Sequence, residues 1–528
     1  MFRVTTAAEA AARDRAAIAA GISAFDLMLA AGTVAAAEVL RRFGHQLGHG
    51  VALFAGTGNN GGDAYVAAAQ LARAGVTVRL HAAGPPRTPD AIRAAALAAP
   101  ALVHGAPGGH ERVVIDGLLG TGHQGPLRRE IAAACVQLRQ AFERGAVLVA
   151  LDVPTGLDAT TGAIAAGSMP AHVTICFGTL KRGVLLQRAH AGAIVVADIG
   201  LDGVADRPGD DDDAAWRWAH GHALAARVPA IAWNAHKGTR GRVGLAGGHE
   251  GMAGAVVLAA RAALRGGAGL VHALVDPASV PAVQALVPQA LVHRWPMAFE
   301  TADDGQHTRL RLDALAIGPG LGRSARSAAT LEWLLGAHRG TPLVLDADAL
   351  WLAADAAQRQ GADAASALRR WTREVPHAVC TPHAGEFARL TGAPWPDAWQ
   401  ARADRLRHFA DTAGVTVLLK GTPTLVAAPG SASLQVVPHG TALLATGGSG
   451  DCLTGIIATL LAQGVRAEDA AVVGATLHGV AAEHATVGAG VRGGTLDDML
   501  EAMPAAWRAL ERPAMYPPGV LATLPAPA

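Results

Sequence analysis

The sequence predicts an α/β protein with two domains, of which the first is a three-layer α/β/α sandwich around a parallel sheet and the second an α/β/α domain. Short apolar runs that suit buried strands alternate with Ala-rich stretches that suit helices along almost the whole chain. Such alternation is typical of parallel sheets covered by helices on both faces. It stops at Asp202–Ala214, where Pro208, Gly209 and the acidic run Asp210–Asp213 are typical of a linker.

The first domain is expected to span residues 1–205. Its predicted strands are Val51–Ala55, Val76–His81, Arg112–Asp116, Val147–Asp152, Val173–Phe177 and Ile194–Asp198. Helices fit between these strands, for example at Ala64–Ala74 and Arg128–Arg144. Residues 206–222 are the predicted linker to the second domain.

The second domain is expected to span residues 223–512, followed by a flexible tail at 513–528. Its predicted strands are Val243–Ala246, Leu270–Val275, Ala314–Ile317, Leu343–Asp346, Ala378–Cys380, Val415–Leu419 and Thr424–Ala427, and a long helical stretch follows Gly447. The two halves carry different motifs and no short-period repeat is visible. We therefore interpret the chain as a fusion of two domains and not as a duplication.

The composition argues against several classes of protein. Lys and Arg number 44 against 43 Asp and Glu, whereas a nucleic-acid-binding protein carries a basic face. Hydrophobic residues make up 51% of the chain, but apolar runs such as Cys452–Val465 are too short to span a membrane. The N-terminus does not resemble a secretory signal, and the four cysteines are far apart, as in reduced proteins. We therefore expect a cytoplasmic protein.

The first domain carries the motif GTGNNGGD, Gly56–Asp63, directly after its first predicted strand. Glycines let the backbone turn sharply and approach a ligand closely. The amides at the start of the following helix attract anions. This arrangement is typical of a dinucleotide or phosphate loop at the carboxyl end of a strand, so we interpret it as a binding loop and not as an ordinary turn.

Further polar segments follow other strands of the first domain. The carboxyl ends of strands converge on one crevice in an open parallel sheet. Asn60, Asp116 and Thr155 are oxygen donors that could jointly hold a hard cation there, although each alone suits a turn or a helix cap. The segments are DGLLGTGHQGP (Asp116–Pro126), LDVPTGLDATTG (Leu151–Gly162) and FGTLKRG (Phe177–Gly183), the last of which supplies Lys181.

Together these segments resemble the NAD(P)H-hydrate epimerase family, also called the YjeF N-terminal domain, over nearly all of the first region. The resemblance implies a Rossmann-like domain that interconverts the R and S hydrates of NADH and NADPH. It implies acid–base catalysis by Asp152 and a potassium ion held by Asn60, Asp116 and Thr155. It also implies substrate contacts at Asn59, Asn60, Gly61, Gly62, Asp63, Gly120, Thr121, Gly122, His123, Gln124, Gly125, Pro126 and Asp152. Ala64 stands where the family usually has Gly.

The chemistry of such an epimerase suits these residues. In the hydrate, a hydroxyl group lies next to the ring nitrogen, whose lone pair can expel it. Water can then return to either face of the ring. The Asp152 carboxylate could move the proton and stabilise the positive ring.

The second domain carries the strongest motif of the chain, ATGGSGDCLTGIIATLLAQG (Ala445–Gly464). A Gly-rich turn opens a helix there, and the amides of Gly448–Gly450 would form an anion hole. Asp451 can take a proton from an attacking hydroxyl group. Phosphoryl transfer needs this combination of a charge cradle and a positioned base. The loop lacks the GxxxxGK[ST] pattern of a Walker P-loop.

This glycine–aspartate arrangement resembles the ribokinase-like superfamily. Further motifs make the whole second region similar to the ADP/ATP-dependent NAD(P)H-hydrate dehydratase family: HKGTRGRVGLAGG (236–248), GMAGAVVLAARAALRGGAGLV (251–271), AIGPGLG (316–322), LDADAL (345–350), TPHAGEFARL (381–390) and LLKGTPTLVA (418–427). The resemblance implies substrate contacts at Ala253, Gly320, His383 and Asp451. It implies nucleotide contacts at Lys420, Gly421, Thr422, Pro423, Thr424 and Gly450. His249 and Ala384 depart from the family pattern, which commonly has Ser and Pro there.

The second resemblance implies ADP-dependent dehydration of the S hydrate to NAD(P)H, with release of AMP and phosphate. Asp451 would deprotonate the ring hydroxyl, and its oxygen would attack the terminal phosphoryl group. A phosphate ester leaves more readily than hydroxide, so elimination restores the ring. A magnesium ion is expected because it neutralises charge on the transferring group.

These resemblances lead us to expect a bifunctional repair enzyme that acts on hydrated NADH and NADPH and on ADP. We expect no nucleic-acid or membrane partner, and a homo-oligomer. One alternative is a ribokinase-like vitamin or sugar kinase, which would leave a stable phosphorylated product. Another is that the first domain only binds a ligand and has no catalytic role.

Overall fold

A computed structural model describes residues 2–104, 109–201, 216–232, 234–295 and 310–510. The chain forms two compact units that divide between Trp216 and Arg217. The predicted break at Asp202–Ala214 and the predicted tail lie outside the described residues. The last part of the predicted linker has regular structure, because strand β10 (Trp216–Trp218) and helix α8 (Gly221–Ala225) lie there.

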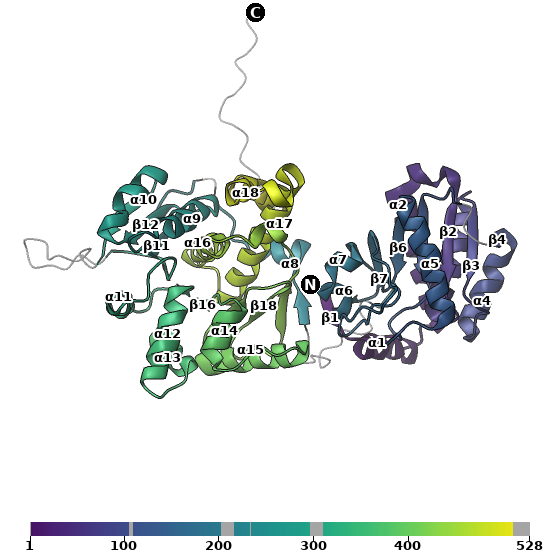
Figure 1. The fold of residues 1–528 in the computed structure, drawn as a ribbon, viewed down its shortest axis with the longest axis horizontal. Helices are drawn as coiled ribbons and strands as arrows, with labels where there is room; N and C mark the ends of the chain where they lie inside the picture. The colour runs from purple at the N-terminus through teal and green to yellow at the C-terminus, as the bar shows by residue number, and fades with distance from the viewer. Residues whose placement is uncertain (1, 105–108, 202–215, 233, 296–309, 511–528) are drawn as a thin grey trace, which may run out of the picture. The chain divides into compact units, whose positions relative to one another are not determined.

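The N-terminal unit contains a seven-stranded parallel sheet in the order β4-β3-β2-β5-β6-β7-β9. Alternate residues of the strands face opposite sides, so Leu53 packs with α2 and α3 whereas Phe54 packs with α5. The sheet therefore lies between two helix layers (Figure 1). The elements are β2 (Val51–Ala55), β3 (Val78–Ala82), β4 (Leu102–His104), β5 (Val113–Gly117), β6 (Val147–Leu151), β7 (Val173–Phe177), β9 (Ala193–Ala197), α2 (Ala24–Phe43), α3 (Asn59–Arg73), α4 (Pro89–Ala98) and α5 (Arg129–Glu143).

The start of the chain adds elements that the sequence did not predict. Strand β1 (Phe2–Thr5) pairs in parallel with β8 (Leu180–Lys181). Helix α1 (Ala7–Ala19) follows, and its first turn is closed by a capping box between Thr6 and Glu9. The short helices α6 (Arg182–Leu186) and α7 (Arg188–Ala191) come after β8.

The C-terminal unit contains a second sheet, in the order β13-β12-β11-β14-β15-β16-β17-β18-β19. The strands from β13 to β17 are parallel, and β18 and β19 continue the sheet in antiparallel pairing. The strands are β11 (Arg242–Gly247), β12 (Leu270–Val275), β13 (Leu291–Arg294), β14 (Ala314–Ile317), β15 (Leu343–Leu345), β16 (Ala378–Cys380), β17 (Thr416–Leu419), β18 (Thr424–Ala427) and β19 (Leu434–Val437).

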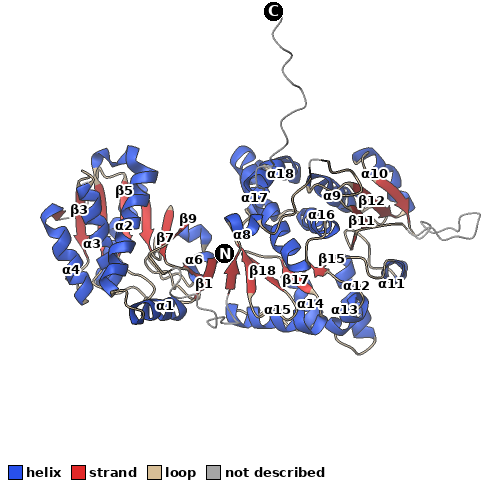
Figure 2. Ribbon diagram, turned by 180° about the vertical axis from the view of Figure 1, so that it is seen from behind, coloured by secondary structure: helices blue, strands red, loops and turns tan. Residues whose placement is uncertain are grey.

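Helices cover both faces of this sheet as well. The main core packs α9, α16, α17 and α18 on one face, and α12, α13 and α15 lie on the opposite side (Figure 2). The helices are α9 (Ala253–Arg265), α10 (Val280–Leu286), α11 (Ala325–Ala337), α12 (Asp348–Arg359), α13 (Ala364–Thr372), α14 (Ala384–Thr391), α15 (Trp399–Ala413), α16 (Ser449–Ala462), α17 (Ala467–Gly493) and α18 (Leu496–Leu510).

The predicted α/β fold class is therefore confirmed, and the second sheet has an antiparallel edge. The chain turns back between β17 and β18 through residues 420–423. A link this short joins antiparallel strands, because a parallel crossover needs a dozen or more residues. The two predicted strands at this edge, Val415–Leu419 and Thr424–Ala427, therefore form an antiparallel pair.

The strand order of each sheet shows where a ligand site is expected. In the N-terminal unit the order reverses beside β2, which lies between β3 and β5. In the C-terminal unit it reverses beside β11, which lies between β12 and β14. Ligands of open α/β sheets bind outside the carboxyl ends of strands at such switch points.

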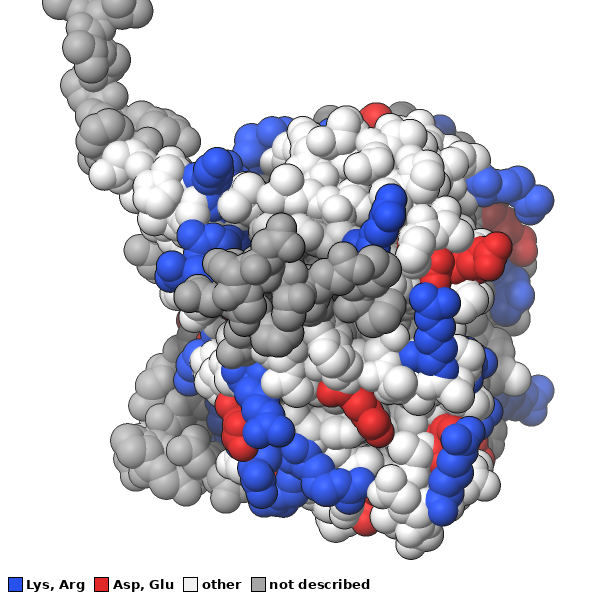
Figure 3. Space-filling model, turned by 90° about the vertical axis from the view of Figure 1, so that its left-hand side faces the viewer, with Lys and Arg blue, Asp and Glu red and all other residues white. Residues whose placement is uncertain are grey.

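The surface agrees with the balanced composition. Figure 3 shows one face of the C-terminal unit, where basic and acidic side chains are interspersed between wide uncharged areas. Within the described residues, no helix is both long and apolar enough to cross a membrane.

Candidate active sites

The first candidate site lies where β2 leads into α3. A Cβ atom built on Gly56 would lie 1.8 Å from the Leu118 carbonyl oxygen, and one built on Gly61 would lie 2.0 Å from the Gly56 carbonyl oxygen. Glycine is therefore required at both positions. No described side chain caps α3 at Gly58, so its first amides are left for a ligand. The expected binding residues Asn59, Asn60, Gly61, Gly62 and Asp63 form the first turn of α3.

Asn60, Asp116 and Thr155 lie together beside this turn. Thr155 Oγ1 donates to Asp116 Oδ1 at 2.7 Å, and the Thr155 amide donates to Asp116 Oδ2 at 2.9 Å. Asn60 Nδ2 donates to the Leu119 carbonyl at 2.9 Å, but its Oδ1 is buried without a hydrogen-bond partner among the described residues. Burial raises the pKa of Asp116, while its bonds from Thr155 and Leu118 oppose that rise.

Asp152 follows β6 in a constrained geometry. Its φ is +62°, a left-handed value that is uncommon for a residue with a side chain. Its Oδ1 accepts a hydrogen bond from the Phe177 amide at 3.1 Å and forms an ion pair with Lys181 Nζ. Lys181 Nζ also donates to the Phe177 carbonyl at 2.7 Å. The sequence predicted that Lys181 lies near the site but gave it no role. In the structure Lys181 is the ion-pair partner of Asp152.

The charges around Asp152 act on each other. Burial alone would lower the pKa of Lys181, but the charge and hydrogen bond of Asp152, together with the effects of Cys176 and Asp14, outweigh burial and the pKa is raised. Lys181 therefore stays an ammonium group. Burial raises the pKa of Asp63 well above its ordinary value, Asp152 raises it further, and Lys181 opposes the rise. Three strand ends and one helix thus bring one lysine and at least two aspartates into a single electrostatic cluster.

The second predicted substrate loop, Gly120–Pro126, lies beside the Asn60 side chain. A Cβ built on Gly120 would lie 3.2 Å from Asn60 Cβ, and most of the loop is at least partly exposed. Burial lowers the pKa of His123, with a smaller opposing effect of Asp158. Ala64, the departure from the family pattern, is fully buried inside α3 and fits its helical conformation.

The second candidate site lies at the start of α16. Gly448 is the N-cap residue with φ +92°, which glycine tolerates, and Asp451 lies in the first turn. Burial raises the pKa of Asp451 to about 7, Asp346 adds to the rise, and Lys420 opposes it. A carboxylate with a pKa near neutrality, beside a helix N-terminus, suits a general base in a charge-stabilising site.

Asp346, at the end of β15, organises this site. Its Oδ1 accepts a hydrogen bond from Lys420 Nζ at 2.9 Å, and its Oδ2 accepts one from Thr454 Oγ1 at 2.8 Å. Lys420 Nζ also lies 3.8 Å from Glu386 Oε2. The LDADAL segment (345–350) contributes to the family resemblance, but the sequence alone gave Asp346 no role. A carboxylate directly after a buried strand was the signal that could have identified it.

Ala253 and Gly320 lie on two touching turns that follow β11 and β14. Gly320 has φ +58°, and a Cβ built on it would lie 2.9 Å from Met252 Cβ. The His249 amide donates to the Gly320 carbonyl at 2.6 Å. The His249 backbone therefore joins the two turns, and its replacement of the usual Ser leaves this contact in place.

His383 caps helix α14. Its Nδ1 accepts hydrogen bonds from the amides of Gly385 and Glu386 at 3.0 and 3.3 Å. The proton of a neutral imidazole is then on Nε2, on a side chain that is 59% exposed. The residue has a structural role, and its outer nitrogen lies 3.6 Å from Glu386 Oε1. Ala384, the other departure, is the first residue of α14.

The predicted nucleotide residues gather around Lys420. A Cβ on Gly450 would lie 3.2 Å from Lys420 Nζ, so this glycine leaves room for the lysine. The Lys420 amide donates to the Pro382 carbonyl at 2.9 Å. Thr424 Oγ1 donates to the Gly421 carbonyl at 3.1 Å and closes the turn that also contains Thr422 and Pro423. The site residues predicted for each half thus lie within one unit.

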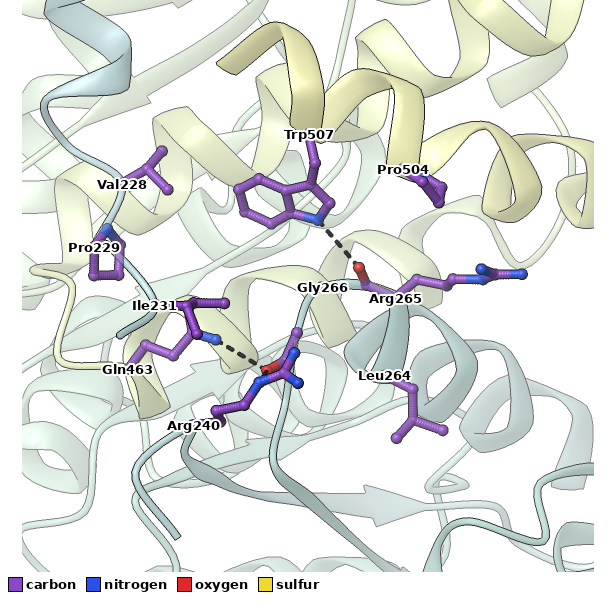
Figure 4. A pocket seen from close by; sticks show the side chains of 11 residues that line it. Val228, Pro229, Ile231, Arg240, Leu264, Arg265, Gly266, Gln463, Pro504 and Trp507 are labelled. Atoms are coloured by element: carbon purple, nitrogen blue, oxygen red, sulfur yellow. Dashed lines mark hydrogen bonds between the residues drawn. The ribbon is translucent and has the colours of Figure 1, made fainter. Parts of the chain in front are cut away.

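A pocket of about 330 Å³ in the C-terminal unit lies away from this site (Figure 4). Trp507 Nε1 donates to the Arg265 carbonyl at 3.1 Å on its wall, and Gln463 Nε2 donates to the Gly267 carbonyl at 3.2 Å. These residues come from α18 and from the ends of α9 and α16 opposite Ala253 and Asp451. The pocket is therefore not part of the reaction site.

Comparisons with known proteins agree with both halves. The family model described as YjeF-related protein N-terminus matches residues 24–183, and the one described as NAD(P)H-hydrate dehydratase matches residues 243–505. The bifunctional NAD(P)H-hydrate repair enzyme of Leishmania braziliensis is 34% identical over 484 residues, which is 86% of this chain and 84% of the relative. The bifunctional NAD(P)H-hydrate repair enzyme Nnr of Coxiella burnetii is 32% identical over 496 residues, or 91% and 94% of the two chains.

Solved structures are similar to the second half. The ADP/ATP-dependent NAD(P)H-hydrate dehydratase from Bacillus subtilis, co-crystallised with ATP and Mg²⁺, is 28% identical. The match covers 55% of this chain and 96% of that chain, with a TM-score of 0.47.

Proposed function

The chain belongs to the family of bifunctional NAD(P)H-hydrate repair enzymes, and from this premise we propose that it restores hydrated NADH and NADPH at two sites. The N-terminal unit epimerises the R and S hydrates. The C-terminal unit dehydrates the S hydrate with ADP as the phosphoryl donor and releases AMP and phosphate. The observation that carries the second reaction is Asp451 in the first turn of α16, where its pKa is raised to about 7.

The epimerase reaction needs a proton to reach and leave the hydroxyl group next to the ring nitrogen. The Asp152–Lys181 pair supports this role because Lys181 and the Phe177 amide hold the Asp152 carboxylate in one position. The Asp152 carboxylate also favours the positive ring that forms when hydroxide leaves. The free amides at the start of α3 would bind the phosphate groups of the substrate.

A monovalent cation fits the site of Asn60, Asp116 and Thr155. Asp116 is buried and forms no ion pair with a basic side chain within the described ranges, so its single charge matches a single positive charge. The unpartnered Asn60 Oδ1 offers a neutral ligand. Potassium would offset the Asp116 charge and hold the two substrate loops in register. Replacing potassium with a bulky organic cation is expected to slow epimerisation and to leave dehydration of the purified S hydrate unchanged.

In the dehydratase reaction, Asp451 takes the proton of the ring hydroxyl, whose oxygen attacks the terminal phosphorus of ADP. The bond from phosphorus to the bridging oxygen breaks and AMP leaves. The phosphate ester on the ring then departs with its bonding electron pair as the lone pair of the ring nitrogen forms an iminium bond. Loss of a proton from the neighbouring ring carbon to the departing phosphate forms the carbon–carbon double bond and restores the neutral dihydropyridine. The amides of α16 stabilise the charge on the transferring group.

Magnesium fits the charge of this site. Asp346, Glu386 and Asp451 act together on the single ammonium of Lys420, so the cluster carries excess negative charge. Among the described residues no three acidic, histidine or cysteine side chains are grouped to hold a metal directly, so these carboxylates would act on the magnesium ion through water. Bound magnesium would neutralise charge on the phosphoryl group during transfer.

The deciding experiment follows the absorbance of the reduced nicotinamide ring while the full chain acts on mixed epimers of NADPH hydrate, with ADP, magnesium and potassium. The wild type is expected to restore all of the substrate, and Asp451→Ala none of it. Asp152→Ala is expected to restore the S fraction rapidly and then to slow to the spontaneous rate of epimerisation. Absence of nucleotide-dependent recovery, or a stable phosphorylated product, would instead indicate a small-molecule kinase.

A further inference from the structure

A row of hydrogen bonds connects helix α7 with the proposed cation site. Ser168 Oγ donates to the Thr155 carbonyl oxygen at 2.6 Å, and His190 Nε2 lies 2.8 Å from the same Oγ. Thr155 Oγ1 in turn donates to Asp116 Oδ1 at 2.7 Å. Ser168 and His190 lie outside the motifs predicted for the first domain, yet both are linked by direct contacts to a proposed cation ligand.

The number of protons sets the direction of these bonds. A serine hydroxyl has one proton, and in Ser168 this proton lies on the bond to the Thr155 carbonyl. The proton between Ser168 and His190 must therefore come from His190 Nε2. Burial lowers the pKa of His190, so the donor is a neutral ring with its proton on Nε2. A hydroxyl that accepts one hydrogen bond donates the next more strongly, because the two bonds polarise each other.

These bonds hold the loop that follows β6. Gly156 has φ +90°, and a Cβ built on it would lie 2.9 Å from Ser168 Cβ. The Ala165 amide donates to the Gly156 carbonyl at 2.8 Å. The loop therefore folds back on itself, so that Ser168 contacts both Thr155 and Gly156 at its start. His190 of α7 then fixes the Ser168 hydroxyl.

The position of Thr155 matters because its hydroxyl can still bind a cation. Thr155 Oγ1 accepts one hydrogen bond, from the Leu119 amide at 3.1 Å, and a hydroxyl oxygen has two lone pairs. Asn60 Oδ1 has no partner among the described residues. Asn60 belongs to α3 and Thr155 to the loop after β6. The distance between these two oxygen ligands therefore depends on how firmly the loop is held.

We propose that Ser168 and His190 are positioning residues of the cation site, which hold Thr155 where it can share a potassium ion with Asn60 and Asp116. This inference rests on the potassium ion of the proposed epimerase site. Neither residue carries a proton of the epimerisation itself, since both act through Thr155. Metal ligands depend in general on the groups that orient them, and loss of such a group weakens metal binding about 10–100-fold.

The first test measures how much potassium the full chain needs. Interconversion of the epimers is followed without ADP at increasing potassium chloride, while a bulky organic cation keeps the ionic strength constant. Ser168→Ala and His190→Leu are expected to raise the potassium concentration for half-maximal rate about tenfold, with a smaller effect on the rate at saturating potassium. His190→Gln is expected to stay near wild type, because its amide can place an N–H where His190 Nε2 lies.

Thermal unfolding of the same proteins gives a measurement that does not depend on activity. A bound ion stabilises the folded state, so potassium is expected to raise the unfolding temperature less in Ser168→Ala and His190→Leu than in wild type. Ser23→Ala is the matched control, because it removes the exposed serine hydroxyl that caps α2. It is expected to lower the unfolding temperature and to leave both responses to potassium unchanged.

The outcomes separate this proposal from the epimerase function on which it rests. A folded Ser168→Ala or His190→Leu protein that needs no more potassium than wild type, and gains as much stability from it, would overturn the positioning role. A wild type that interconverts the epimers but responds to potassium in neither measurement would overturn the cation site. A wild type that does not interconvert them at all would overturn the epimerase function itself.

Discussion

The two proposed catalytic aspartates are controlled by different means. Asp152 is fixed in position by a left-handed backbone and by donors from Phe177 and Lys181. Asp451 lies at a helix start, where burial and the Asp346 charge hold back its ionisation. The structure thus fixes the position of the Asp152 carboxylate, whereas at Asp451 it sets the pH at which the carboxyl group loses its proton.

The raised pKa of Asp451 predicts a pH dependence for dehydration. A general base must be deprotonated, so kcat/KM for the S hydrate is expected to rise with pH up to about 7 and then to level off. Because Asp346 raises this pKa, the rise should move to lower pH in Asp346→Asn. Measurements of kcat/KM against pH, on the purified S hydrate at saturating magnesium and ADP, test this. A rise of kcat/KM at the same pH in Asp346→Asn and in the wild type would contradict the prediction.

The ion pair of Lys420 with Asp346 predicts an effect on stability. In Lys420→Met the Asp346 side chain, 2% exposed, loses its charged partner. Breaking a buried ion pair on one side costs roughly 3 kcal/mol. The variant is therefore expected to unfold at a clearly lower temperature than the wild type. Lys237→Met removes an exposed lysine and is the control, and equal unfolding temperatures for the two variants would argue against the pair's role.

Among the secondary-structure elements, glycines are required where two backbone segments are in contact, because a side chain would not fit between them. The β2–α3 turn of the first unit packs on the segment after β5 through Gly56, and the β11–α9 turn of the second packs on the segment after β14 through Gly247. A Cβ on Gly247 would lie 1.9 Å from the Pro319 carbonyl oxygen. Each turn follows the strand at which the sheet order reverses. The close contact between the two backbone segments therefore lies where a ligand is expected to bind.

This contact predicts a contrast between two neighbouring substitutions. Gly56→Ala forces a Cβ to within 1.8 Å of a backbone oxygen, whereas Gly58→Ala meets no atom within 4 Å. Overpacking a close contact costs about 1–3 kcal/mol or more. We expect Gly56→Ala to lower the thermal stability of the protein and to abolish epimerisation, and Gly58→Ala to remain folded. Similar unfolding curves for the two variants would show that the turn can relax.

At the scale of the whole molecule, the chain carries two folds with two chemistries. Each site is complete within its own unit, since the residues proposed for epimerisation lie in Phe2–Trp216 and those proposed for dehydration lie after Arg217. The substrate is a small molecule that can leave one site and reach another through solution.

This separation predicts complementation between damaged chains. An equimolar mixture of Asp152→Ala and Asp451→Asn proteins is expected to restore mixed epimers of NADPH hydrate completely, because each supplies the activity that the other lacks. The measurement is the final absorbance of the reduced ring, compared with each variant alone. Recovery that stops at the S fraction would show that the two sites must belong to one chain.

The sequence by itself determined the α/β class and most of the long strands. Val51–Ala55, Val173–Phe177 and Leu270–Val275 match the structure in both bounds, because continuous apolar runs ending at glycine or aspartate have few other solutions. The short strands β1, β4, β8, β10, β13 and β19 were missed. A strand of two to four residues acquires its conformation from its pairing partner, and its own pattern is too short to predict it.

The sequence also determined which residue types could carry the chemistry, since the motifs NNGGD and GGSGD are read directly from the chain. Only the tertiary structure decided their partners: Lys181 for Asp152, and Lys420 and Thr454 for Asp346. Charge interactions and desolvation depend on distance and burial in space, and residues 74 or 108 positions apart in the chain become neighbours only when the strands of a sheet end at one edge.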